Sequence, residues 1–110
     1  MTAQQTTRIR ELNDIFRNSL VGGRIMLTTG VRALGPLNLP ALINLVREYN
    51  HFREGNDPYG EHDFGSIDFN AATYFWKIDY YDKSLKQGSE DPADPDKTTR
   101  VLTVMCADEY

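Results

Sequence analysis

The side chains best suited to chemistry lie between Asp57 and Asp82, in the segment DPYGEHDFGSIDFNAATYFWKIDYYD. Glu61, His62 and Asp63 are adjacent there and supply two carboxylates and an imidazole. These groups serve in general acid–base catalysis and bind divalent cations. We therefore expect any site of this protein to lie on or beside this segment.

The first hypothesis is a metal site formed by Glu61, His62 and Asp63. Strand alternation opposes it, because Glu61 and Asp63 would share one face while His62 points to the other, unless a turn or bulge re-aims them. The alternative is a solvated turn whose carboxylates accept backbone hydrogen bonds and whose histidine pairs with a carboxylate. The sequence favours this alternative, and no metal or other cofactor is expected.

The second hypothesis is a small metal-assisted hydrolase centred on the same turn. His62 would act as a general base, Asp63 or Asp79 would fix its tautomer, and Tyr80 or Tyr81 would hold the substrate. No serine-nucleophile signature accompanies these residues. The catalytic set is therefore incomplete.

The third hypothesis is a nucleotide or small-molecule site formed by Tyr80, Tyr81 and an arginine of the N-terminal half. Aromatic side chains on strands stack nucleobases in several nucleic-acid modules. Direct binding of nucleic acid is not expected, because Lys77 and Lys83 are the only cations among these rings and the nearby carboxylates repel phosphates.

Charge is distributed unevenly along the chain. Residues 1–53 carry seven arginines against three acidic residues, whereas residues 54–110 carry thirteen acidic residues against five basic ones. Such an acidic half either keeps a protein soluble or forms an acidic surface that docks on a basic partner. The expected binding residues are Asp57, Glu61, His62, Asp63, Tyr80, Tyr81 and Asp82.

Size and composition predict a single globular domain over residues 1–110. Hydrophobic residues make up 40% of the chain and charged residues 25%, which is typical of soluble domains. No apolar run reaches the roughly 20 residues that cross a bilayer, and the N-terminus lacks a secretory signal. Cys106 is the only cysteine, lies in an apolar run and is expected to be structural. We expect a cytoplasmic protein that does not bind membranes.

Two helices and four strands are expected to position the candidate residues. Apolar spacings of three and four predict a helix over about residues 7–20, and a second helix begins after Gly35-Pro36 with Asn38 as its cap. Alternating patterns and turn residues predict strands over residues 24–29, 64–69 and 73–80, and an apolar run predicts another over 100–107. For 100–107 the continuous apolar run favours a central strand, with a buried helix as the alternative.

These elements predict an α+β fold in the order α-β-α-β-β-β, with a small, mainly antiparallel sheet and both helices on one face. Within residues 73–80, alternation places Tyr74, Trp76, Ile78 and Tyr80 on the same face. Trp76 and Ile78 are expected to be buried against helix 7–20.

The motifs DPYGEHDFG, FWKIDYYD and RVLTVMCADEY resemble a family of small bacterial proteins of unknown function, DUF3768. The resemblance extends from IRELNDIFR through LTTGV to the C-terminus. It implies a free-standing, single-domain cytoplasmic protein often carried on plasmids and other mobile elements. It implies no reaction, cofactor or catalytic residue.

The sequence favours a non-enzymatic protein-interaction module. The acidic half, the aromatic hairpin and the incomplete catalytic set support this choice. The mobile-element resemblance suggests an inhibitor of a host defence or replication system. A protein partner is expected, and the sequence leaves open whether the chain forms a homodimer.

Overall fold

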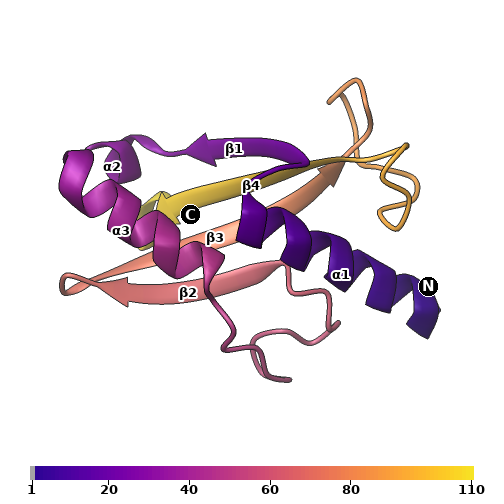
Figure 1. Cartoon of the computed structure of the whole chain (residues 1–110), viewed down its shortest axis with the longest axis horizontal. Helices are drawn as coiled ribbons and strands as arrows, with labels where there is room; N and C mark the ends of the chain where they lie inside the picture. The colour runs from indigo at the N-terminus through magenta and orange to yellow at the C-terminus, as the bar shows by residue number, and fades with distance from the viewer. Residues whose placement is uncertain (1) are drawn as a thin grey trace.

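The computed structural model describes residues 2–110 and consists of a four-stranded sheet with two longer helices on one face (Figure 1). The expected α+β class is confirmed. The elements are α1 (Ala3–Ser19), β1 (Gly23–Leu27), α2 (Thr29–Arg32), α3 (Gly35–Arg47), β2 (Phe64–Phe69), β3 (Ala72–Tyr81), β4 (Thr99–Cys106) and the 3₁₀ turn η1 (Ala107–Glu109). The short helix α2 and the turn η1 add to the expected order.

The strands lie in the order β1-β4-β3-β2. β1 pairs with β4 in parallel, whereas β4 with β3 and β3 with β2 are antiparallel, so the sheet is mainly antiparallel as expected. β4 lies between β1 and β3, which is the central position that its continuous apolar run predicts. The alternative of a buried helix over residues 100–107 is excluded.

Helix α1 begins four residues before the predicted start. Thr2 caps it, because its hydroxyl accepts a hydrogen bond from the Gln5 amide at 3.1 Å while the Gln5 side chain accepts one from the Thr2 amide at 2.9 Å. Helix α3 also begins early, at Gly35, with Pro36 in its first turn, where no amide donor is needed. Asn38 is therefore inside the helix and does not cap it.

A two-residue turn joins β2 to β3. Asn70 and Ala71 both have positive φ angles, 50° and 64°, which is the geometry that matches the right-handed twist of a hairpin. The pairing of Phe69 with Ala72 follows directly and sets the register of the hairpin. That register decides which residues of β3 face the helices.

The core lies between the two helices and the inner face of the sheet. Trp76 is fully buried and Ile78 is nearly so, as expected. Gly65 lies directly opposite Trp76 in the register, and a Cβ atom there would collide with the indole ring. The glycine therefore lets the largest core side chain lie flat against β2.

Neither α1 nor α3 covers the outer face of the sheet (Figure 1). Register places the following residues of β1, β3 and β4 on that face: Arg24, Met26, Thr73, Phe75, Lys77, Asp79, Tyr81, Thr99, Val101, Thr103 and Met105. Within residues 2–110, no helix is both long enough and apolar enough to cross a membrane.

Candidate functional site

The turn over residues 57–63 is docked on α1 through His62. His62 has a φ of 55°, and its Nδ1 lies 2.9 Å and 3.1 Å from the two carboxylate oxygens of Asp14. Its Nε2 lies 3.6 Å from Asp57, whose other oxygen accepts a hydrogen bond from the His62 amide. The ring stacks on Phe52 at a centroid distance of 3.7 Å. Both ring nitrogens and one ring face of His62 are thus occupied.

Glu61 belongs to a second group of bonded side chains. Tyr80 donates its hydroxyl to Glu61 at 2.7 Å and accepts from the Asn13 amide group at 2.8 Å. Asn13 is fully buried, and its carbonyl oxygen accepts from Arg100 Nε at 2.7 Å. Burial, followed by the hydrogen bond to Glu61, raises the pKa of Tyr80. Tyr80 is therefore a neutral donor that holds the turn to the sheet.

The remaining acidic candidates are separated from His62. Asp79 lies on the outer face of the sheet, where it pairs with Lys77 at 3.0 Å. Asp82 accepts hydrogen bonds from Ser84 and the Lys86 amide, which lower its pKa. The carboxylates that contact His62 are those of Asp14 and Asp57.

Asp63 has the least favourable environment for a charge. Burial, followed by the neighbouring charge of Glu61, raises the pKa of its carboxyl group. The backbone carbonyl oxygen of Asp63 accepts a hydrogen bond from the Ile78 amide, and this bond extends the β2–β3 ladder by one residue pair. No hydrogen bond joins the side chain of Asp63 to His62 among the described residues.

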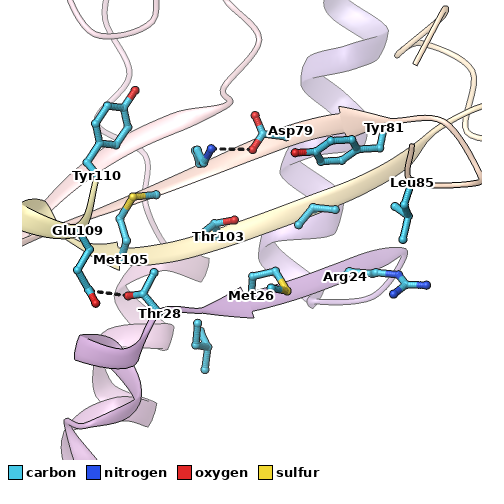
Figure 2. Close-up of a pocket in the computed structure, with 13 residues that line it drawn as sticks. Arg24, Met26, Thr28, Asp79, Tyr81, Leu85, Thr103, Met105, Glu109 and Tyr110 are labelled. Carbon is cyan, nitrogen blue, oxygen red and sulfur yellow. Dashed lines mark hydrogen bonds and ion pairs between the residues drawn. The ribbon is translucent and has the colours of Figure 1, made fainter. Parts of the chain in front are cut away.

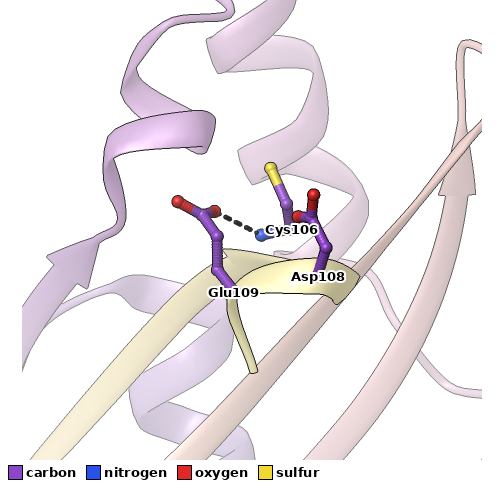
Figure 3. A group of neighbouring side chains, drawn as sticks. All are labelled: Cys106, Asp108 and Glu109. Carbon is purple, nitrogen blue, oxygen red and sulfur yellow. Dashed lines mark hydrogen bonds between the residues drawn. The ribbon is translucent and has the colours of Figure 1, made fainter.

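A different group brings three potential metal ligands together. The ligand atoms of Cys106, Asp108 and Glu109 lie within 4.8 Å of one another (Figure 3). Within residues 2–110, Glu61, His62 and Asp63 do not form such a group.

Glu109 in this group is already occupied by hydrogen bonds. Its carboxylate accepts from the Thr28 hydroxyl at 2.6 Å and from the amides of Gly30 and Cys106 at 2.9 Å each. These donors lower the pKa of Glu109 to about 2. Burial and the nearby Glu109 raise the pKa of the Cys106 thiol to about 11, which favours the neutral thiol over the nucleophilic thiolate. The group links the end of β4 to the start of α2.

A large hollow lies on the outer face of the sheet. It has a volume of about 780 Å³ and is floored by Val101, Thr103 and Met105 of β4. Figure 2 shows Arg24, Tyr81 and Leu85 at one end and Thr28, Glu109 and Tyr110 at the other, with Met26 beside the floor. We call this hollow the outer groove.

The outer groove combines apolar, aromatic and charged side chains. Met26 is 56% exposed and Tyr110 is 76% exposed. Tyr110 packs edge-on against Phe64 and Phe75, with ring centroids 6.1 Å and 5.6 Å apart. Arg24 has no ion pair within the described chain, whereas Lys77 is paired. Exposed apolar side chains that lie beside a hollow, such as Met26 and Tyr110, are a feature of interaction sites.

Of the expected site residues, Asp79 and Tyr81 line the outer groove. Asp57, Glu61, His62 and Tyr80 lie in the bonded network on the helix side. Sequence reasoning missed Met26, Thr103 and Met105. Their signal was present: both strands alternate in period two, and two helices that pack on one face of a sheet leave the other face open.

Comparison with known families agrees with the resemblance seen in the motifs. The family model of the proteins of unknown function DUF3768 matches residues 27–109, and the chain belongs to this family. The match includes the 57–63 turn and most of the outer groove, but not α1, which supplies Asn13 and Asp14. No curated protein and no solved structure matches the chain.

Proposed function

We propose that this DUF3768 protein is a non-enzymatic interaction module that binds a protein partner in the outer groove. The supporting observation is that apolar side chains lie on a sheet face that neither long helix covers. A sheet face that meets only water carries polar residues, whereas this face carries the exposed Met26 and the half-buried Val101. A partner surface would remove these side chains from water.

The placement of the reactive side chains supports a non-enzymatic role. A general base must lie within hydrogen-bond reach of a substrate proton. His62 instead contacts Asp14 and Asp57, and Glu61 is bonded to Tyr80. These contacts join the turn to α1 and the sheet. A role in stabilising the fold is therefore sufficient to account for His62 and Glu61.

The acidic half of the chain favours a basic partner. The β3–β4 connection contains Leu85, which lines one end of the outer groove, and it also carries four acidic residues: Glu90, Asp91, Asp94 and Asp96. Opposite charges around an apolar contact speed encounter and select the partner. The motifs' resemblance to mobile-element proteins motivates the more specific proposal, a bacterial host protein of a defence or replication system.

A matched pair of variants tests the groove. Met26→Lys places a charge in the groove, whereas Leu37→Lys makes the same change at a side chain of α3 that is 87% exposed. In a pull-down from bacterial lysate, we expect Met26→Lys to lose partners that Leu37→Lys retains, with both variants melting like the wild type. Equal capture by the two variants would contradict the proposal.

A small-molecule ligand in the same groove is the second candidate. The groove volume of about 780 Å³ falls within the roughly 300–1,000 Å³ typical of ligand pockets. Tyr81 and Arg24 lie together at one end, where a ring and a cation would suit a nucleotide. Calorimetric titration with ATP and GTP tests it: saturable binding that is lost in both Tyr81→Ala and Arg24→Ala would replace the protein partner with a nucleotide.

Metal-assisted hydrolysis has a separate test. Calorimetric titration with Mg²⁺, Mn²⁺ and Zn²⁺ is carried out on the wild type and on His62→Ala. We expect no difference between the two, because the His62 ring already contacts two carboxylates. Stoichiometric metal binding that disappears in His62→Ala would overturn the non-enzymatic proposal.

A further inference from the structure

A second, smaller cleft lies along the outer edge of the sheet. It has a volume of about 350 Å³ and separates the C-terminal end of α3 from β2. Its lining residues are Leu45, Glu48, Tyr49, His51, Ser66, Ile67 and Asp68. None of them lines the outer groove, so the two surfaces can be tested separately.

The backbone of β2 offers unused hydrogen bonds beside this cleft. The bond from the Ile78 amide to the Asp63 carbonyl fixes the alternation of the β2–β3 ladder. Gly65 and Ile67 therefore direct their backbone groups toward β3, whereas Ser66 and Asp68 direct theirs outward. β2 is the last strand of the sheet, and no other strand of the described chain pairs with this edge.

The cleft combines an apolar floor with an acidic rim. Leu45 is 40% exposed and lies beside Tyr49 and Ile67, which are almost fully buried. Glu48 and Asp68 supply the rim, and neither forms an ion pair within the described chain. No lysine or arginine lines the cleft. The charge of the rim therefore complements a basic ligand.

We propose that the edge of β2 and this cleft bind an extended basic peptide segment of a partner protein, which adds a strand to the sheet. The segment would form main-chain hydrogen bonds with Ser66 and Asp68 and place an apolar side chain over Ile67. Strand alternation would then place its lysine or arginine residues on the opposite face, where they would pair with Asp68 beside Thr73. The charge of Glu48 on the cleft side would attract the same basic segment at longer range. This inference goes beyond the proposed function, because it assigns a second surface and the chemistry of its ligand.

Two alternative roles for the edge of β2 fit the structure less well. An exposed charge on an edge strand protects against aggregation, but protection does not require an apolar cleft beside the strand. A second copy of the chain would pair β2 with β2 and bring two acidic rims together, which costs free energy through repulsion between like charges. A basic partner segment would both bond the unused backbone groups of β2 and complement the negative charge of the rim.

The test uses a synthetic peptide of about seven alternating lysine and valine residues, long enough to span a strand of this length. Its control is a peptide of alternating glutamate and valine residues. In a ¹⁵N NMR titration, we expect the lysine peptide to shift the outward amides of Ser66 and Asp68 more than the inward amides of Gly65 and Ile67. We expect no saturable shift with the glutamate peptide.

Variants separate edge pairing from general attraction. Ser66→Pro removes an outward amide that β3 does not use, so the sheet should persist while peptide binding is lost. Glu48→Gln and Asp68→Asn remove one rim charge each and should weaken binding about threefold to tenfold. Asp96→Asn removes the same charge from an exposed position in the β3–β4 connection and should leave binding unchanged.

Several outcomes would overturn the proposal. These are equal shifts with the two peptides, shifts confined to Met26 and Thr103 of the outer groove, or binding that survives Ser66→Pro with the fold intact. If Ser66→Pro does not fold, the double variant Glu48→Gln/Asp68→Asn decides, because unchanged affinity there rejects the acidic rim. Met26→Lys should retain peptide binding, so failure of the outer-groove proposal is distinguishable from failure of this one.

Discussion

Tyr80 and Tyr81 are neighbours in β3, yet they face two different environments. Tyr80 lies on the inner face and is bonded to Glu61 and Asn13. Tyr81 lies on the outer face, where it lines an open groove with Arg24 and Leu85. The inner face uses its polar groups to hold the fold together, whereas on the outer face the side chains of Arg24 and Tyr81 form no ion pair or hydrogen bond within the described chain.

Polar side-chain groups buried on the inner face form hydrogen bonds within the protein, and among the described residues the indole N–H of Trp76 is the exception. Arg17 is only 5% exposed and donates to the carbonyl oxygens of Val46 at 3.0 Å and Tyr49 at 2.9 Å. Its guanidinium also lies 4.9 Å from the centroid of the Trp76 ring. Burial lowers the pKa of Arg17, and these contacts offset the cost of desolvation.

The largest expected difference between the faces concerns β3 itself. Trp76→Ala removes the largest fully buried side chain and should cost about 3–5 kcal/mol of the free energy of unfolding. Phe75→Ala removes a half-buried ring from the outer face and should cost clearly less. Chemical denaturation of both variants measures the difference, and equal losses would remove the distinction between the faces.

The next effect concerns the buried amide at the centre of the inner network. Asn13→Ala removes the acceptor of Arg100 Nε and the donor to the Tyr80 hydroxyl, and it should cost about 1–3 kcal/mol of the free energy of unfolding. Asn18→Ala, at an exposed position of the same helix, serves as the control and should cost less than about 0.5 kcal/mol. Equal melting temperatures for Asn13→Ala and Asn18→Ala would show that the network adds no stability.

A conservative change compares the two tyrosines directly. Tyr80→Phe removes the hydroxyl that bonds Glu61 and should cost about 1 kcal/mol of the free energy of unfolding. Tyr81→Phe should leave this free energy unchanged, because no hydrogen bond of the described chain uses its hydroxyl. Urea denaturation at neutral pH checks both values, and the contrast fails if Tyr81→Phe is the more damaging change.

Lowering the pH should change the contributions of Asp63 and Glu109 to folding stability in opposite directions. The pKa of Asp63 is raised in the folded protein, so its charge opposes folding above that pKa. Asp63→Asn should therefore be more stable than the wild type at pH 7. The advantage should shrink as the pH falls through the raised pKa toward 3.8, the ordinary value.

Glu109 provides the opposite case. Its folded pKa of about 2 lies below the ordinary value of 4.5, so its stabilising effect is present above pH 4.5 and is lost as the pH falls toward 2. Glu109→Gln should be less stable than the wild type at pH 7, with a difference that vanishes near pH 2. Thermal melts of both variants across pH 2–7 measure the two slopes. Slopes of the same sign would contradict the assigned environments.

Local sequence patterns were sufficient to predict the α+β class, the bounds of β2, the central position of β4 and the burial of Trp76. The patterns are alternation in period two, apolar spacing along helices, and turn residues between them. They also placed Tyr80 on the core face, because alternation along a strand is set by backbone geometry.

The roles of the polar residues depend instead on contacts between distant segments. Asn13 meets Tyr80 across 67 positions of sequence and His62 meets Asp14 across 48, and no local pattern links such pairs. The positive φ of His62 re-aims its ring toward α1, which alternation alone cannot predict. The predicted placement of both helices on one face already left the other face open. The outer groove, however, combines β1 with Leu85 and Tyr110, and this combination depends on the packing of distant segments.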